Sequence, residues 1–416
     1  MQMMGAVRQP SSATALNFLG DIDHFPTPKP KSKRALIAFS PDAWLIAKSD
    51  YPNIKLFNFY GLTYEIVRAL NLNGYIVDIT SMKQEHTPAK TYDLFLGHGG
   101  KCRTTIERLP QRTPIFQYVS GSHWQGFNIE SEERYARYAE SRRVPKPSSF
   151  IRDLTPILEG ENFLAESADV FLTINCPRMV ETFGSLKRKF FFTGFGAYPD
   201  EALAVPFAKR NFEKGKKGFL YVAGSGGNIQ KGLDILLEAF TRCPTLHLYI
   251  YCKVEEEVLS TYRKELDLPN IHFIYHLKQP FFRKCLTDLL REINFTIHAP
   301  INSGIGTAFM GSLAHGYIPV GYVDLPPHGD CSVNRENWSV DSITDCITEA
   351  GEKSSDWCRA AHKQVLTLYN EICGTESLRA KLEEAFSDPH VDAVKRKKLE
   401  AGLCEAASQN ETSMNS

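Results

Sequence analysis

Short apolar segments alternate with amphipathic segments along most of the chain, which is the pattern of parallel α/β units. In the first half, apolar segments predict strands at residues 35–40, 75–80, 93–97, 114–119, 170–175 and 189–193. Several are almost entirely apolar, as expected for strands that are covered on both faces. Between the first two, a predicted helix places four apolar residues on one face: Leu62, Ile66, Ala69 and Leu70.

A second series of the same kind follows a charged stretch at residues 209–217. Its apolar segments predict strands at 218–223, 246–252, 271–275, 293–298 and 317–322. Helices are expected to begin between or after these strands, near Lys231, Val254, Pro280, Gly306 and Val340. The first of them buries apolar residues at helical spacing: Leu233, Leu236, Leu237 and Phe240.

The repeated alternation predicts an α/β protein with two facing Rossmann-like domains. Ligands of such domains bind outside the carboxyl ends of the strands, so the functional cleft is expected between the two sheets. Two final helices, at 356–370 and 376–386, either stay with the second domain or pack across to the first. The expected division is a flexible tail at 1–34, an amino-terminal domain at 35–208, a carboxyl-terminal domain at 209–388 and a polar tail at 389–416.

Composition limits the kinds of partner to be expected and indicates a cellular compartment. Lys+Arg and Asp+Glu number 48 each, so no excess of positive charge points to nucleic acid. The 10 cysteines form no C-x-x-C pair, which favours a reducing, cytoplasmic location. No signal-like segment and no apolar run long enough for a membrane span is present, although basic helices leave peripheral membrane contact open.

The strongest chemical signal is the turn between the strand at 218–223 and the helix near Lys231, which contains Gly224, Ser225, Gly226 and Gly227. Glycines let backbone N–H groups approach an anion, and both the helix start and Lys231 add positive charge. Two interpretations remain open: a diphosphate site, or an ordinary strand-to-helix turn with a surface lysine. A dinucleotide fingerprint is excluded because Ile229 replaces its third glycine, and a P-loop is excluded because G-K-[ST] is missing.

This segment resembles the start of the donor domain in family 4 glycosyltransferases, where a glycine turn precedes a K-G-(L/V)-D-x-L-(L/I)-x-A-F helix. The matching residues are Gly224, Lys231, Gly232, Leu233, Asp234, Leu236, Leu237, Ala239 and Phe240. Residues 269–272 and 314–320 resemble two further motifs of the family, in the same order. The G-S-G-G turn is most similar to that of a bacterial subgroup.

The resemblance implies a GT-B fold and a retaining, metal-independent hexosyltransferase with no cofactor. Its donor would be a nucleotide-sugar, and its acceptor a glycan, a lipid-linked molecule or a small molecule. Lys231 would contact the donor diphosphate and act in catalysis. Further donor contacts are expected from backbone N–H and hydroxyl groups at Ser303, Gly304, Gly306 and Thr307.

The sequence departs from the family at three positions. The two glutamates of the family's Glu-x7-Glu motif are replaced by Ser303 and Gly311, and Gly226 stands where many members have an arginine. A carboxylate accepts two hydrogen bonds from a ribose diol, which a glycine cannot do. Two alternatives therefore remain: a catalytically degenerate glycosyltransferase-like protein that acts as a binding or regulatory subunit, and a sugar-nucleotide epimerase.

On the acceptor side, two histidines follow predicted strands: His98 in L-G-H-G-G and His123 in G-S-H-W. The resemblance favours His123 as the catalytic residue, and the alternative for either is a structural turn or helix-capping histidine. Gly61, Asn175 and Glu161 are further candidates for this side of the cleft.

Two other charged features are a charged helix after His123 and an Asp-x-Asp sequence near the amino terminus. The segment 128–143 predicts a helix whose charges either form solvated i,i+4 ion pairs or contact an anionic acceptor. No D-x-D motif follows a strand, since Asp21 and Asp23 lie in the tail, and no metal site is expected.

Overall fold

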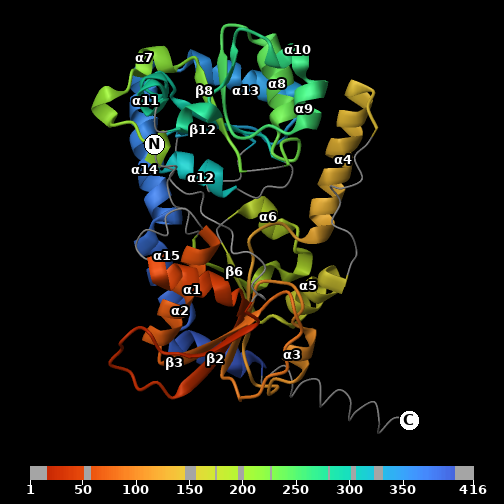
Figure 1. Cartoon of the computed structure of the whole chain (residues 1–416), viewed down its shortest axis with the longest axis vertical. Helices are drawn as coiled ribbons and strands as arrows, with labels where there is room; N and C mark the ends of the chain where they lie inside the picture. The colour runs from red at the N-terminus through yellow and green to blue at the C-terminus, as the bar shows by residue number, and fades with distance from the viewer. Residues whose placement is uncertain are drawn as a thin grey trace, which may run out of the picture.

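The structure is a computed structural model. It describes residues 16–50, 58–145, 156–173, 176–194, 201–224, 227–279, 282–300, 306–322 and 331–398. In Figure 1 the chain forms two α/β domains stacked along the long axis of the molecule, each built around one sheet. The predicted fold class is confirmed.

The amino-terminal sheet has seven strands in the order β1-β3-β2-β4-β5-β6-β7. All neighbours pair in parallel except β1, which runs antiparallel to β3. The strands are β1 (Phe18–Ile22), β2 (Lys33–Phe39), β3 (Tyr75–Ser81), β4 (Leu94–Gly97), β5 (Ile115–Tyr118), β6 (Val170–Thr173) and β7 (Phe190–Phe192).

The carboxyl-terminal sheet has six parallel strands in the order β10-β9-β8-β11-β12-β13. The strands are β8 (Gly218–Val222), β9 (His247–Tyr251), β10 (Ile271–Phe273), β11 (Phe295–His298), β12 (Ile318–Gly321) and β13 (Val333–Asn334). Both sheets are covered by helices on their two faces, which explains why most strand residues are buried and apolar.

All eleven predicted strands are present, with shifted ends, and two strands were missed. The short β13 completes the edge of the second sheet. The strand β1 corrects the placement of residues 18–22 in a flexible tail, because they pair with β3 through a register shift. Only Ile22 of this edge strand is buried, so its sequence lacks the apolar pattern that identifies the other strands.

The first domain contains α1 (Pro41–Asp50), α2 (Asn58–Leu72), α3 (Arg103–Glu107), α4 (Trp124–Arg142), α5 (Pro156–Ser167) and α6 (Pro177–Glu181). The second contains α7 (Phe212–Gly215), α8 (Leu233–Arg242), α9 (Glu256–Thr261), α10 (Arg263–Leu266), α11 (Arg283–Leu290), α12 (Thr307–Leu313) and α13 (Val340–Glu352). Four 3-10 helices are also described: η3 (Gly184–Lys189), η4 (Glu201–Leu203), η5 (Phe207–Lys209) and η6 (Tyr275–Lys278).

The last two long helices join the domains. Helix α14 (Ser355–Cys373) begins on the second domain, and α15 (Thr375–Ala385) packs on α2 of the first (Figure 1). Leu378, Leu382 and Phe386 belong to the same apolar core as the amino-terminal sheet. The polar tail predicted from residue 389 is helical over 388–398, and the Lys398 ammonium there lies 3.1 Å from the Asp169 carboxylate. The chain therefore returns to its first domain, an outcome that the sequence had left open.

The segment 201–208 also packs differently from the expected division. Leu203 and Val205 lie in an apolar cluster with β8 residues, and the Tyr317 hydroxyl donates to the Leu203 carbonyl at 3.0 Å. This segment therefore belongs to the carboxyl-terminal domain, where it precedes α7.

Helix α4 corrects both interpretations of the charged segment 128–143. Its arginines pair with carboxylates of the second domain, and Arg134 is fully buried rather than solvated. Tyr135 and Tyr138 of α4 share an apolar core with Tyr221 and Ile229. This helix therefore lies within the first domain along the chain, but part of its surface packs against the second domain.

Candidate functional site

The order of strands in the second sheet reverses between β8 and β11, the central pair. In a doubly wound sheet a crevice opens at such a switch point, outside the carboxyl ends of the strands, and ligands bind there. Gly224 and Lys231 follow β8 and Ala299 follows β11, so these described residues border the two walls of the crevice expected there.

Backbone geometry explains the glycine that follows Lys231. Gly232 has φ +88°, a conformation that residues with a Cβ rarely adopt, and it caps α8 at its amino end. A Cβ at this position would lie 2.1 Å from the carbonyl oxygen of Ala299. The glycine therefore allows the turn after β8 to touch the end of β11.

Lys231 lies in this turn, half-buried, with its Nζ donating to the Gly224 carbonyl at 3.2 Å. Burial lowers the pKa of Lys231, while the Cys252 thiol and the Glu255 carboxylate act in the opposite direction. A bound anion would favour the charged form. An anion bound beside Lys231 would therefore raise its pKa again, and the contact of Lys231 with a donor diphosphate stays a prediction.

The backbone N–H groups of the turn have an internal partner that the sequence did not reveal. The Glu255 carboxylate accepts from the Gly227 N–H and from the Asn228 N–H, both at 2.8 Å. In return, the Asn228 side chain accepts from the Glu255 N–H at 2.7 Å. A carboxylate of the protein thus occupies two of the donors that were expected to hold a diphosphate. Glu255 lies beyond β9, and no local motif connects it with the turn.

The remaining donor-side candidates are only partly described. Ser225, Gly226, Ser303 and Gly304 lie outside the described residues. Gly306 is exposed and precedes α12, whose first residue is Thr307. Gly311 is buried inside α12, so the position of the second family glutamate lies within the protein core.

A cavity of about 170 Å³ lies in the first domain, beyond the carboxyl ends of β4 and β5. Its lining is mostly polar: His98, Gly99, Gln117, Tyr118, Val119, Ser120, Gly121, Ser122, Glu161 and Phe183. Of the predicted acceptor-side residues, His98 and Glu161 therefore meet at one cavity.

His98 is held in one orientation by its neighbours. Its ring stacks on Phe39 at 5.3 Å, and its Nδ1 lies 3.1 Å from the Tyr118 carbonyl oxygen. A carbonyl only accepts, so Nδ1 carries the proton and Nε2 of the neutral ring is an acceptor. Burial lowers the pKa of His98, which keeps the ring neutral near pH 7.

Two further polar groups line the cavity, and sequence reasoning missed both. Ser122 and Gln117 are 4% and 5% exposed. Among the described residues, no hydrogen-bond partner lies within reach of Ser122 Oγ or Gln117 Oε1. A buried polar atom without a partner costs about 1–3 kcal/mol, so these atoms are suited to a hydroxylated ligand. The signal for Ser122 was the S-G-S turn after β5; Gln117 resembled an ordinary strand residue.

His123, the predicted catalytic residue, lies just beside this cavity. It precedes α4 without a side-chain capping bond, and its backbone N–H donates to the Thr182 hydroxyl at 2.9 Å. Its ring packs against Phe183, which lines the cavity, at 5.3 Å. Gly61 is buried within α2, away from the cavity lining, and Asn175 lies outside the described residues.

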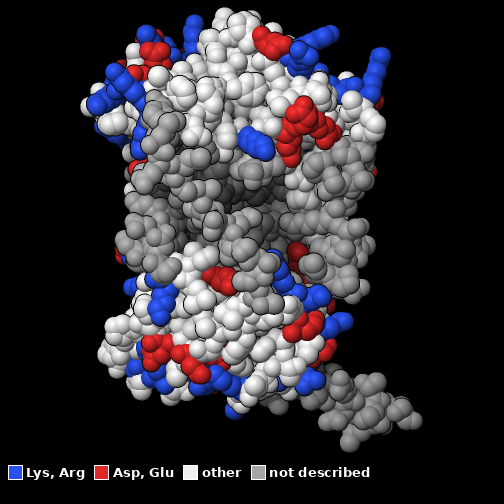
Figure 2. Space-filling view, in the orientation of Figure 1, with Lys and Arg blue, Asp and Glu red and all other residues white. Residues whose placement is uncertain are grey.

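The carboxyl ends of the two sheets face each other. Arg178 of α6, which follows β6, lies over the ring of Tyr322, which follows β12, at 3.9 Å. Its Nη2 also donates to the Arg335 carbonyl at 3.2 Å. On the face drawn in Figure 2, the described Lys and Arg side chains lie among Asp and Glu over both domains, consistent with the balanced composition.

Among the residues that the structure describes, no group of three or more His, Cys, Asp and Glu side chains is placed to hold a metal ion. No helix in the same residues has the length and apolar character needed to cross a bilayer.

Comparison of the sequence with protein-family models and with curated proteins finds no match. Comparison with solved structures does. Sucrose-phosphate synthase from Thermosynechococcus elongatus matches over 85% of this chain and 98% of its own, with 11% identity and a TM-score of 0.53. The Anabaena protein HepE in complex with UDP matches over 85% of this chain and 99% of its own, with 11% identity and a TM-score of 0.50. At this identity the likeness concerns the fold, and the chain has the GT-B fold of two facing Rossmann-like domains.

Proposed function

We propose that this protein transfers a sugar from a nucleotide-sugar donor to a hydroxylated acceptor. The observation that carries the proposal is the pairing of two sites across facing strand ends. Lys231 lies at the switch point of one sheet, and the polar cavity at His98 lies beyond the strands of the other. The UDP bound in the HepE structure, which has the same fold, supports a nucleotide donor.

On the donor side, Lys231 stabilises the leaving diphosphate. Charge develops on the phosphate oxygens as the glycosidic bond breaks, and a fixed ammonium in a half-buried site lowers the energy of that state. Additional N–H groups would come from the turn at Gly224 and from the segment before α12. The retaining, metal-independent course rests on the resemblance of the 224–240 segment to family 4 glycosyltransferases.

On the acceptor side, the cavity binds a hydroxyl-bearing group. Gln117 Oε1 accepts a hydrogen bond from one hydroxyl, and Ser122 Oγ both donates and accepts hydrogen bonds. His98, whose Nδ1 donates to the Tyr118 carbonyl, adds a neutral ring to the lining of the cavity. His123 orients the substrate from beside Phe183. Facing domains exclude water, which favours transfer over hydrolysis.

The test is release of nucleoside diphosphate from a panel of UDP-, ADP- and GDP-sugars with mono- and disaccharide acceptors. Lys231→Ala should lower turnover at least tenfold, because a hydrogen bond to a charged group contributes about 1.5–3 kcal/mol. Lys217→Ala is the matched control, since this exposed lysine precedes β8 at the opposite end of the same strand. Near-normal turnover in Lys231→Ala would reject the assignment.

One observation favours the alternative, a binding or regulatory subunit without transferase activity. Glu255 already occupies two N–H donors of the turn, and Gly311 offers no side chain to a ribose. If Glu255 blocks the site, Glu255→Gln should bind nucleoside diphosphates more tightly than the wild type does. Sugar transfer by the wild type with any donor would eliminate this alternative.

A further inference from the structure

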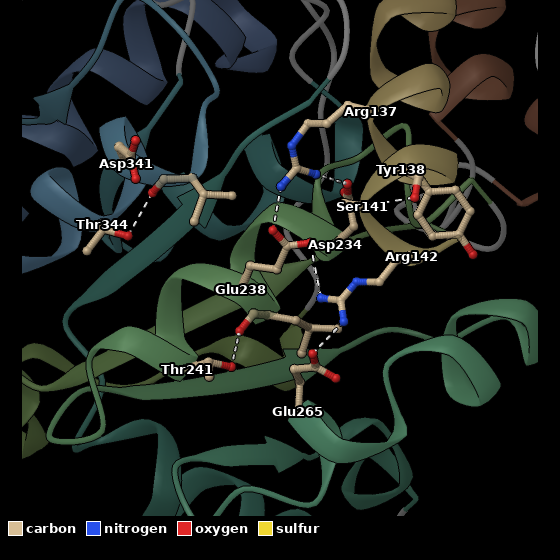
Figure 3. Close-up of polar contacts among 12 residues, drawn as sticks. Arg137, Tyr138, Ser141, Arg142, Asp234, Glu238, Thr241, Glu265, Asp341 and Thr344 are labelled. Atoms are coloured by element: carbon tan, nitrogen blue, oxygen red, sulfur yellow. Dashed lines mark hydrogen bonds and ion pairs between the residues drawn. The ribbon is translucent and has the colours of Figure 1, made fainter. Parts of the chain in front are cut away.

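Helix α4 of the first domain packs against α8, the helix that follows the predicted donor turn in the second domain. Its residues Arg134, Arg137, Tyr138 and Arg142 are spaced i, i+3, i+4 and i+8, so they share one helix face. Figure 3 shows this face meeting α8, with Arg137 and Arg142 projecting from α4 toward it. The Tyr138 hydroxyl lies 3.1 Å from the Thr261 hydroxyl at the end of α9.

The outer part of this contact is an ion-pair network. Arg137 bonds to Glu238, and Arg142 bonds to Glu238 at 3.1 Å and to Glu265 at 2.6 Å (Figure 3). The Arg142 guanidinium also lies over the ring of Tyr262, whose hydroxyl donates to Glu238 at 3.1 Å. These contacts hold the end of α4 against α8 and α10.

The contact at Arg134 differs from this network because Arg134 reaches residues beside the crevice between β8 and β11. Arg134 Nη2 donates to Asp234 at 2.9 Å and to the Ala299 carbonyl at 3.2 Å. Its guanidinium lies 4.5 Å from the ring of Trp338, and both Arg134 and Asp234 are fully buried. Asp234 lies in the first turn of α8, three residues after Lys231, whereas Ala299 directly follows β11.

A single nitrogen of Arg134 therefore connects the two walls of the crevice. The Ala299 carbonyl that accepts this bond is the same one that Gly232 approaches closely. The Asp234 carboxylate is fixed on its other oxygen by Arg137 at 3.4 Å. Displacement of Arg134 would release both the start of α8 and the end of β11, between which Lys231 lies.

From this geometry we infer that Arg134 is a positioning residue of the donor site, supplied by the opposite domain. It sets the distance between the turn after β8 and the end of β11, and Arg137 holds the other oxygen of its partner Asp234. The role in donor binding rests on the proposed function; the role in fixing the turn does not.

The test compares two chemically identical changes on one helix face. A lysine side chain is one bond shorter than arginine and carries its charge on one atom. Arg134→Lys should break the bridge between Asp234 and Ala299, whereas Arg142→Lys weakens only the outer network. Both variants are examined by hydrogen–deuterium exchange below their unfolding temperatures, with Arg134→Gln as a neutral second variant.

We expect Arg134→Lys to raise amide exchange at residues 227–236 at least tenfold, whereas Arg142→Lys raises it at 256–266 and leaves the turn as in the wild type. Unchanged protection of the turn in Arg134→Lys would overturn the inference, as would equal loosening of the turn by Arg142→Lys. Failure of both Arg134 variants to fold would also contradict it, because the residue would then be required for folding itself and not for the position of the turn.

The role of Arg134 in donor binding is tested separately, by measuring the affinity of the wild type and both variants for UDP, ADP and GDP. A nucleotide that binds the wild type should bind Arg134→Lys at least tenfold more weakly and Arg142→Lys with unchanged affinity. If no nucleotide binds the wild type, the proposed function fails, and the exchange experiment still decides whether Arg134 fixes the turn.

Discussion

The buried pair between Arg134 and Asp234 makes a strong prediction for stability. The ions lie 2.9 Å apart with no solvent exposure, and Arg137 approaches the other Asp234 oxygen at 3.4 Å. Burial raises the pKa of Asp234 and lowers that of Arg134, so each ion depends on its partner to remain charged. Asp234→Asn keeps the shape and removes the charge. Breaking a buried pair in this way costs about 3–5 kcal/mol.

Urea unfolding followed by tryptophan fluorescence measures this loss, because Trp338 lies over Arg134. With a slope of about 3 kcal/mol/M, the midpoint should fall by about 1–1.7 M. Asp341→Asn is the control. This change breaks the ion pair with Arg242, in which the Arg242 side chain is 52% exposed and the Asp341 side chain 84% exposed. It should lower the free energy of unfolding by less than about 1 kcal/mol.

A double variant tests the reasoning from the other direction. Arg134→Met with Asp234→Leu removes both charges and leaves no buried ion without a partner, so it should recover most of the stability that Asp234→Asn loses. A loss in Asp234→Asn as small as that of Asp341→Asn would refute the argument, because the carboxylate would then contribute no more than an exposed one.

Three other predictions follow from single positions. Gly232→Ala should destabilise the fold by several times the change in Gly306→Ala, since only the first requires a positive φ and meets the carbonyl of Ala299, and comparison of their melting temperatures checks this. Burial and the Arg210 charge lower the pKa of His362 from 6.5 to about 4. The stability that the neutral ring contributes is therefore complete above pH 6.5 and is lost as the pH falls toward 4. Between pH 7 and 4, the free energy of unfolding of the wild type should fall by about 3 kcal/mol more than that of His362→Gln. Ser122→Ala should leave the melting temperature unchanged or raised while turnover falls, since it removes a buried hydroxyl that lacks a partner among the described residues; a clear loss of stability would show that the hydroxyl is satisfied in the free protein.

The fold was accessible from sequence because strands covered on both faces give uninterrupted apolar segments. The segment at β8, Gly218–Val222, is buried throughout and was predicted within one residue. Edge strand β1 has one buried residue, so no pattern identified it. The return of α15 to the first domain depends on which surface receives Leu378 and Leu382, and amphipathic periodicity does not specify a partner surface.

The candidate site was accessible only where one segment contains its parts. The turn from Gly224 to Lys231 is contiguous, so it could be named as a candidate from the sequence. Glu255 and Arg134 reach the turn from 28 and about 100 positions away, and neither has a local signature. Gln117 became a candidate only because the structure places its oxygen in a cavity beside His98. Side chains brought together by topology carry information that spacing along the chain does not.

Binding of a nucleotide-sugar diphosphate at Lys231 can be measured without knowledge of the acceptor. The melting temperature is measured with UDP, ADP, GDP and their sugar conjugates for the wild type, Lys231→Ala and Lys217→Ala. Ligand at about one hundred times its Kd adds about 2.7 kcal/mol of stability. The account predicts that at least one nucleotide stabilises the wild type and Lys217→Ala but not Lys231→Ala. Stabilisation of all three proteins alike, or of none, would contradict it.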